Sequence, residues 1–242
     1  GKPIDVHQAI KHACVALQIV AEAAQAQTFF AAITVASLRT DALLQVLSAV
    51  RGGKLQYLDA ASANGELFLL IAGIGFDAAV VAALDRVRTG PITMWSYVMP
   101  ALQTLWESRF LPLSVSADGR AVFGPAPAMV FVGNVKEYGT GFPVLPRAKS
   151  DDGLLDVCIL PCASHEDLLR LALHTMAGEH ATLEGAQYLT ARRVSVQAAK
   201  PVPVQLDGDS AGATPVEIEL LPIRVPFIVR DRVPGSGFRD PG

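Results

Sequence analysis

The chain has 242 residues, of which 51% are hydrophobic and 18% charged, and its formal net charge is −3 at pH 7. This length allows one large domain or one and a half small ones, which is enough to bury a core. The small negative charge argues against a nucleic-acid partner, which would normally require a basic surface. Three cysteines, Cys14, Cys158 and Cys162, match no common zinc or thioredoxin spacing. We therefore expect free thiols in a reducing, cytoplasmic compartment.

Residues 1–53 are predicted to form an N-terminal helical segment. Residues 6–36 contain neither Gly nor Pro, and residues 42–50 follow Asp41 as a helix cap and end at Gly52-Gly53. The apolar stretch 13–38 carries Glu22 and several glutamines, which favours a packed helix over a membrane span. Because the chain begins with Gly1, we expect a fragment, a processed product or a cloned piece whose true start is unknown.

Residues 54–230 are predicted to form one mainly β domain. Asn64-Gly65 is typical of a tight type I′ hairpin, and Asp118-Gly119 also separates two strand-like runs. Short strands, frequent turns and the absence of regular βαβ alternation favour an antiparallel β-sandwich. The predicted fold class is therefore α+β, mainly β, with helical insertions and a preceding helical segment. The expected strands are 55–61, 66–71, 113–117, 120–123, 128–132, one around Val157, 194–198, 202–206, 216–220 and 225–229.

Helices are expected at 77–87, 93–110 and 166–177, and a disordered tail at 231–242. In the second helix Trp95, Met99, Leu102 and Trp106 share one apolar face, although Pro100 should kink the helix. That face is typical of ordinary core. In the third helix, Ser164 is the predicted N-cap. Four residues of this helix are expected to face inward: Leu168, Leu169, Leu171 and Ala172.

The segment 73–78 satisfies the loose G-x-G-x-x-A pattern of dinucleotide-binding loops. That function also needs a parallel strand about 20 residues later that ends in an acidic residue. The sequence instead continues into a predicted helix. The glycines are more typical of a tight transition from strand to helix.

Two acidic turns are candidate sites. At Asp151-Asp152-Gly153 the glycine permits φ > 0, so carboxylates and main-chain carbonyls can converge on a hard cation. At Asp207-Gly208-Asp209 one carboxylate at the end of a strand could take the proton of an attacking hydroxyl. From local sequence alone, a solvated turn is the alternative at both places, and turn statistics favour it.

Three stretches in this order resemble the lipid kinase family that includes bacterial diacylglycerol kinases and sphingosine and ceramide kinases. They are FLLIAGIGFDAAVV (68–81), GNVKEYGTGFPVLPRAKSDDGLLDV (133–157) and VPVQLDGDSAGATPVEIELLP (202–222). The resemblance covers residues 41–229, and the first 40 residues have no counterpart. It implies the C-terminal domain of a lipid kinase, which transfers phosphate from ATP to a lipid hydroxyl. In such a kinase the alternative for the apolar face of helix 93–110 is the border of an acyl-chain cleft.

The resemblance also implies roles for individual residues. Asp209 would be the base that activates the lipid hydroxyl, at a position where the family usually has Glu. Mg²⁺ would be held by the Asp152 carboxylate and by the main-chain oxygens of Lys149 and Leu154, with Asp151 in support. The family binds ATP through a Gly-Gly-Asp-Gly-Thr loop on a separate N-terminal domain, and this loop does not occur in the sequence. ATP is therefore expected as a co-substrate bound outside this chain.

The expected partner is a lipid substrate of the diacylglycerol type. A cytoplasmic protein that contacts the inner face of the membrane peripherally would fit this substrate, since no span and no polybasic helix is evident. The alternative function is a non-catalytic lipid- or partner-binding β-sandwich. The sequence predicts neither the oligomeric state nor which lipid is the acceptor.

Overall fold

The computed structural model describes residues 54–87, 110–137 and 143–229. Residues 59–222 form one compact unit, and residues 54–58 and 223–229 are the described part of a second. Three expectations lie outside the described residues: the N-terminal helices, nearly all of the helix at 93–110 with its Trp and Met face, and the tail at 231–242.

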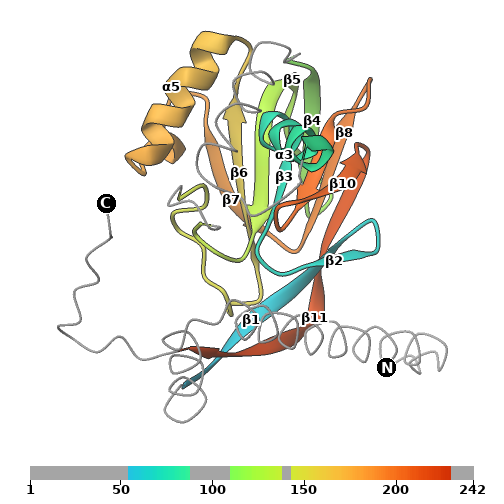
Figure 1. The fold of residues 1–242 in the computed structure, drawn as a ribbon, viewed down its shortest axis with the longest axis vertical. Coiled ribbons are helices and arrows are strands. Elements are labelled where there is room, and N and C mark those ends of the chain that lie inside the picture. Colours follow the sequence, from blue (N-terminus) through green and yellow to red (C-terminus); the bar gives the residue numbers. More distant parts are fainter. Residues whose placement is uncertain (1–53, 88–109, 138–142, 230–242) are drawn as a thin grey trace. The chain divides into compact units, whose positions relative to one another are not determined.

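The strands form two mostly antiparallel layers that share one long strand, β5 (Figure 1). In sheet A the order is β2-β1-β11-β8-β4-β5, and in sheet B it is β10-β9-β3-β5-β6-β7. The expected antiparallel β-sandwich is thus confirmed. The strands are β1 (Lys54–Ala63), β2 (Glu66–Phe68), β3 (Ile71–Ile74), β4 (Pro112–Ala117), β5 (Arg120–Gly133), β6 (Leu155–Pro161), β7 (Gln187–Ala191), β8 (Arg193–Ala198), β9 (Pro203–Leu206), β10 (Asp209–Ala213) and β11 (Val216–Val229).

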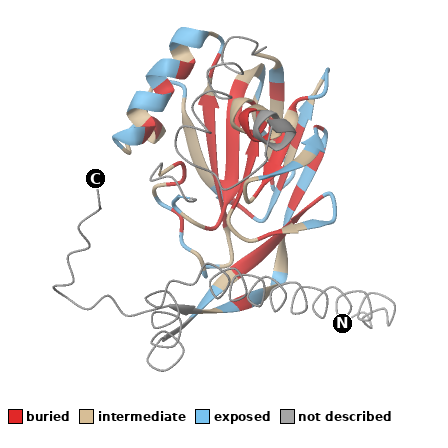
Figure 2. Ribbon diagram, in the orientation of Figure 1, coloured by how far each residue is buried: buried red, intermediate tan, exposed pale blue. Residues whose placement is uncertain are grey.

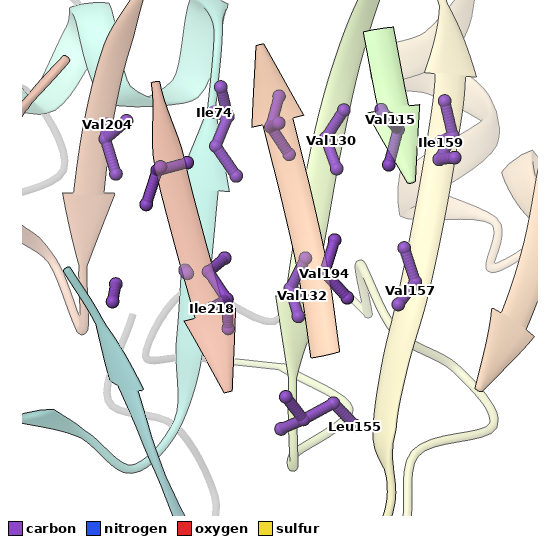
Figure 3. Close-up of a cluster of buried hydrophobic side chains, with 14 of the residues drawn as sticks. Ile74, Val115, Val130, Val132, Leu155, Val157, Ile159, Val194, Val204 and Ile218 are labelled. Carbon is purple, nitrogen blue, oxygen red and sulfur yellow. The ribbon is translucent and has the colours of Figure 1, made fainter. Parts of the chain in front are cut away.

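The main core lies between the two sheets. Alternate residues of each strand point inward, so Val130 and Val132 of β5 meet Val194 and Ile218 from the opposite layer (Figure 3). These side chains are almost completely buried, and Figure 2 shows the buried centre of the strands in red. Burial of this kind stabilises the sandwich by about 1.5–3 kcal/mol for each large aliphatic side chain.

Tight turns connect several strands where the sequence predicts them. Asn64 and Gly65 have φ of 50° and 88°, and Asp118 and Gly119 have φ of 47° and 79°, as type I′ turns require. The carboxylate of Asp118 also accepts the backbone N–H groups of Arg192 and Arg193 at 2.9 Å. The first turn is held by the Asn64 side chain, which donates to the carbonyl oxygen of Pro215 at 3.0 Å.

Strand β5 corrects the expectation of two separate strands at 120–123 and 128–132. It is a single strand of 14 residues, although it contains Gly124, Pro125 and Pro127. Its first half pairs with β4 in sheet A and its second half pairs with β3 and β6 in sheet B. A bulge near Val115 accommodates the bend. Prolines are tolerated here because this is where the strand leaves one sheet and enters the other.

Two helices cover the outer face of sheet B, α3 (Phe76–Val87) and α5 (His165–Met176). Both confirm their expected positions, and the Ser164 hydroxyl caps α5 by accepting the N–H of Asp167 at 3.0 Å. The inward face of α5 differs from the expectation. Leu168, Leu171 and Thr175 are buried, whereas Leu169 is 63% exposed and Ala172 is also exposed. The face of α5 that packs against the sheet is therefore narrower than the apolar face that its sequence indicates.

Cys158 and Cys162 are buried free thiols, as expected, and Cys14 lies outside the described residues. Burial raises the pKa of both thiols to about 12. None of the helices in the described ranges is long and apolar enough to cross a membrane.

Candidate functional site

One end of sheet B collects polar side chains from β5, β6 and β9, together with backbone groups of the segment that leads into β3. Along this end Ile71 of β3 pairs with Gly133 of β5, and Gly133 pairs with Asp156 of β6. On the other side of β3, Asp207 follows β9 and donates its N–H to the Ile71 carbonyl oxygen at 3.0 Å. We use the name polar end of sheet B for the side chains of Asn134, Asp156 and Asp207 together with the backbone groups of Leu69 and Leu70.

Asp207 is bound almost entirely by the backbone. Its carboxylate accepts three consecutive N–H groups, from Leu69 at 2.7 Å, Leu70 at 2.8 Å and Ile71 at 2.9 Å. Burial raises the pKa of this carboxyl against the opposing effect of these donors, and the nearby charge of Asp209 raises it further. This carboxylate therefore has a structural use, since it joins the β9–β10 turn to the start of β3.

Asp209 is placed differently, although it is only two residues away. Asp207 and Gly208 have φ of 50° and 93° and make the tight turn, and Asp209 is the first residue of β10, opposite Leu206. Its side chain is exposed to solvent. The turn thus fixes one carboxylate internally and leaves the other accessible to solvent.

The Asp151-Asp152-Gly153 turn is tied to β1. Asp59 is buried, its N–H donates to the Ser150 carbonyl oxygen at 2.7 Å, and its carboxylate accepts the Gly153 N–H at 2.6 Å. Gly153 has φ of 76°, as expected from the sequence. The turn is therefore bonded to the sandwich on both sides of its two aspartates.

Asn134 links the two acidic turns. This buried side chain donates to the carbonyl oxygens of Asp59 at 2.6 Å and Leu69 at 3.3 Å. Since Asp59 holds the Ser150–Gly153 turn and Leu69 is bound by Asp207, a continuous series of hydrogen bonds joins the two motifs. The Asn134 Oδ1 atom has no hydrogen-bond partner among the described residues.

A second network surrounds Asp156. The Tyr188 hydroxyl and the Lys149 N–H bind its carboxylate, and the Arg147 N–H donates to the Tyr188 hydroxyl oxygen at 3.2 Å. The Arg147 guanidinium carbon also lies 5.0 Å from the centre of the Tyr188 ring. Burial raises the pKa of Asp156, and the neighbouring charge of Asp152 adds to this effect. The same burial raises the pKa of Tyr188.

The expected magnesium ligands fit an oxygen-donor site in their chemistry. Asp151 and Asp152 are exposed, and one oxygen of Asp152 accepts the Leu154 N–H at 3.1 Å, which leaves further lone pairs for a cation. No group of three or more His, Cys, Asp or Glu side chains within the described ranges could hold a metal. Any site here would therefore combine the Asp152 carboxylate with main-chain oxygens, which Mg²⁺ accepts together with water.

The Gly73–Ala78 segment makes the expected strand-to-helix transition. β3 ends at Ile74, Gly75 has φ of 110°, and α3 begins at Phe76. Asp77 in the first turn of α3 accepts a hydrogen bond from Gln205, the residue two positions before Asp207. All three stretches that carry the family resemblance thus meet around the polar end of sheet B.

Sequence reasoning missed Asp59, Gln205, Asp156 and Tyr188. For Asp59 a signal existed, because an acidic residue within a strand-like run of apolar and small residues requires a buried partner. Asp156 and Tyr188 face each other only through the pairing of β6 with β7, and Gln205 meets Asp77 of α3, which is 128 residues away in the sequence.

The described residues therefore form an antiparallel β-sandwich that carries two bonded acidic turns at one end. Residues 71–229 match the family model described as the YegS C-terminal NAD kinase beta sandwich-like domain, and the chain belongs to this family.

Curated relatives share this part of the chain. A diacylglycerol kinase of Mycobacterium tuberculosis is 32% identical over 155 residues, which are 64% of this chain and 50% of that protein. A diacylglycerol kinase of Bacillus subtilis is 26% identical and is matched over 72% of this chain and 57% of its own. A probable lipid kinase YegS-like protein of Stenotrophomonas maltophilia is 28% identical, with shares of 64% and 44%. The chain spans about half the length of these relatives.

The crystal structure of a putative diacylglycerol kinase from Bacillus anthracis has the same fold. It matches with a TM-score of 0.50 at 24% identity, over 69% of this chain and 54% of that one.

Proposed function

We propose that this chain is the acceptor-side domain of a lipid kinase, which transfers the γ-phosphate of ATP to the hydroxyl group of a diacylglycerol-type lipid. The names of the relatives support a lipid kinase-like function. The observation that carries the proposal is the β9–β10 turn, in which the bound Asp207 leaves Asp209 exposed.

In this proposal Asp209 is the general base. The lipid hydroxyl oxygen forms a bond to the γ-phosphorus, the bond from that phosphorus to the β-phosphate oxygen breaks, and the hydroxyl proton passes to the Asp209 carboxylate. Aspartate is one methylene shorter than the glutamate usual in the family. The fixed β9–β10 turn therefore has to bring the Asp209 carboxylate within reach of the lipid hydroxyl.

ATP would bind on a domain outside this chain. Asp152 and the main-chain oxygens of Lys149 and Leu154 would hold Mg²⁺, and this cation would offset negative charge near the phosphates. The hydrogen bonds through Asp59 and Asn134 would fix the turn at residues 151–153 relative to the β9–β10 turn that carries Asp209. The lipid would come from a membrane surface, contacted peripherally at its cytoplasmic face.

The test is transfer of labelled phosphate from ATP to diacylglycerol in mixed micelles, with the longest natural reading frame that contains this chain. Asp209→Asn should lower kcat by about 10²–10⁴-fold, the usual contribution of a positioned base. Asp209→Glu should retain activity, because it keeps the carboxylate. Glu219→Gln, an exposed carboxylate on β11, is the matched control and should behave as the wild type.

Two results would contradict the proposal. Full activity of Asp209→Asn would exclude this residue as the base. Absence of transfer to diacylglycerol, a sphingoid base and a polyprenol alike would exclude the kinase function. That second result would favour the alternative, a non-catalytic sandwich that binds a lipid or a protein partner.

A further inference from the structure

Gln205 is a buried amide on β9, the strand next to the edge strand β10 of sheet B. It lies on β9 opposite Gly73 of β3 and is 0% exposed. Its neighbours Val204 and Leu206 point into the core between the sheets, so the Gln205 side chain points to the opposite face of the sheet, which α3 covers. Burying an amide is unfavourable unless its donor and acceptor are both satisfied.

The two ends of this amide bind two different elements. Its Oε1 atom accepts the N–H of Gly208, the second residue of the β9–β10 turn, at 2.8 Å. Its Nε2 atom donates to the Oδ2 atom of Asp77, in the first turn of α3, at 3.1 Å. One side chain therefore joins the turn that carries Asp209 to the start of a helix about 130 residues earlier in the sequence.

Gly73 leaves the space in which this bridge is made. A Cβ atom on Gly73 would lie 2.5 Å from the Asp77 Oδ2 atom and 2.6 Å from the Gln205 Nε2 atom. Both distances are shorter than a non-bonded contact allows, so a side chain at Gly73 would separate Asp77 from Gln205. The close approach of these two side chains thus depends on the glycine.

We infer that Gln205 is a positioning residue, which fixes the Gly208 amide against α3 and thereby sets where the Asp209 carboxylate stands. The inference rests on the proposed function of Asp209 as the base. Asp207 anchors the first residue of the turn to β3, and Gln205 anchors the second residue to α3. The turn is therefore bound at both of its central residues, and Asp209 follows directly.

The inference is first tested without any catalysis. In protein labelled with ¹⁵N-glycine, the Gly208 amide should exchange with solvent at least about tenfold faster in Gln205→Met, which keeps the side-chain length but has no amide. The control is Val196→Ala, which removes core packing on β8 without touching the bridge. It should leave Gly208 exchange unchanged relative to other glycines of the sheet. Equal protection of Gly208 in Gln205→Met and wild type would overturn the inference.

Phosphate transfer by the full-length protein is the second readout. Gln205→Met should lower kcat by about 10²-fold, the effect expected from a misplacement of roughly 1 Å, with KM for ATP unchanged. It should also shift the acid limb of the pH profile of kcat/KM, which reports the base. Val196→Ala, by contrast, should lower stability while kcat per folded molecule stays the same. A Gln205→Met variant with wild-type kcat and pH profile would overturn the positioning role.

Substitutions at the other end of the bridge test its geometry. Asp77→Asn keeps an oxygen that can accept from Gln205, so it should retain more activity than Asp77→Ala. Gly73→Ala should resemble Gln205→Met in both readouts. No phosphate transfer by the wild-type protein would overturn the proposed function and with it the catalytic use of the bridge. The exchange rate of Gly208 would still decide whether Gln205 holds the turn.

Discussion

The carboxylate of Asp59 accepts the N–H of Gly153 at 2.6 Å, although the two residues are 94 positions apart in the sequence. Asp59 is 3% exposed and stands on β1, and Gly153 ends the acidic turn before β6. The Asp59 N–H also donates to the Ser150 carbonyl oxygen. The conformation of the acidic turn therefore depends on a side chain of a distant strand as well as on its own sequence.

Replacing Asp59 should destabilise the protein measurably. Asp59→Ala leaves the Gly153 N–H without its acceptor and should cost about 2–3 kcal/mol in the free energy of unfolding. Asp59→Asn keeps an oxygen and should cost less. Asp151→Ala, an exposed carboxylate of the same turn, should change stability by no more than about 0.5 kcal/mol. Urea unfolding measures all three, and equal values for Asp59→Ala and Asp151→Ala would contradict the structural role.

Substitution of Asp207 should lower the stability of the protein, whereas substitution of Asp209 should leave it nearly unchanged. Asp207→Ala exposes or orphans three backbone N–H groups and should cost about 2–4 kcal/mol of stability. Asp207→Asn should cost nearly as much, because its amide group has only one acceptor oxygen for three donors. Asp209→Asn should leave stability within about 0.5 kcal/mol of wild type, since its side chain is exposed. Denaturant unfolding of the three variants checks this, and a strongly destabilised Asp209→Asn would contradict it.

The turns of this fold could be predicted from the sequence because their chemistry is local. Asn64-Gly65 adopts the positive φ values that a tight hairpin requires, and Gly75 makes the expected turn from β3 into α3. The course of β5 could not be predicted, because Gly124, Pro125 and Pro127 usually end a strand, and only the two sheets on either side explain why this one continues. β10 was missed for a similar reason, since its sequence DSAGA has little strand preference.

The candidate site was predicted only in part, for a physical reason. Asp152 and Asp209 stand out in the sequence because each lies beside a glycine in a turn. The division of roles within Asp207-Gly208-Asp209 depends on which carboxylate faces the N–H groups of Leu69, Leu70 and Ile71. That choice is made by the pairing of β9 with β3, a contact between segments about 130 residues apart. Periodicity within one strand carries no information about it.

Magnesium should stabilise the protein through Asp152. A ligand that binds only the folded state at about 100 times its Kd adds about 2.7 kcal/mol of stability, so Mg²⁺ should raise Tm after treatment with a chelator. Asp152→Asn keeps the acceptor for the Leu154 N–H but removes the charge, and should weaken this response. Leu154→Ala should retain it, because the proposed ligand at this position is the main-chain oxygen. An undiminished rise in Tm for Asp152→Asn would exclude this carboxylate as a ligand.

His180 should make the stability of the fold dependent on pH. It is completely buried in the short 3₁₀ helix η1 (His180–Thr182), and its Nε2 atom lies 3.0 Å from the Val144 carbonyl oxygen. Because that oxygen can only accept, the proton is on Nε2 and the neutral ring has an unprotonated Nδ1. This Nδ1 atom has no hydrogen-bond partner in the described part of the chain. Protonation would therefore place an unsatisfied charge in the interior, and burial accordingly lowers the pKa of His180 below 6.5.

The sign of the effect follows from proton binding. Between the lowered pKa of the folded state and the ordinary value of 6.5, the unfolded chain binds more protons at this residue than the folded one. The contribution to stability is thus complete above pH 6.5 and is lost as the pH falls, by at most about 1.4 kcal/mol per pH unit. His180→Gln should flatten this slope between pH 7 and the lowered pKa, whereas His174→Gln on the surface of α5 should retain it. The measurement is the free energy of unfolding as a function of pH. A slope that His180→Gln leaves unchanged would show that another group causes the pH dependence of stability.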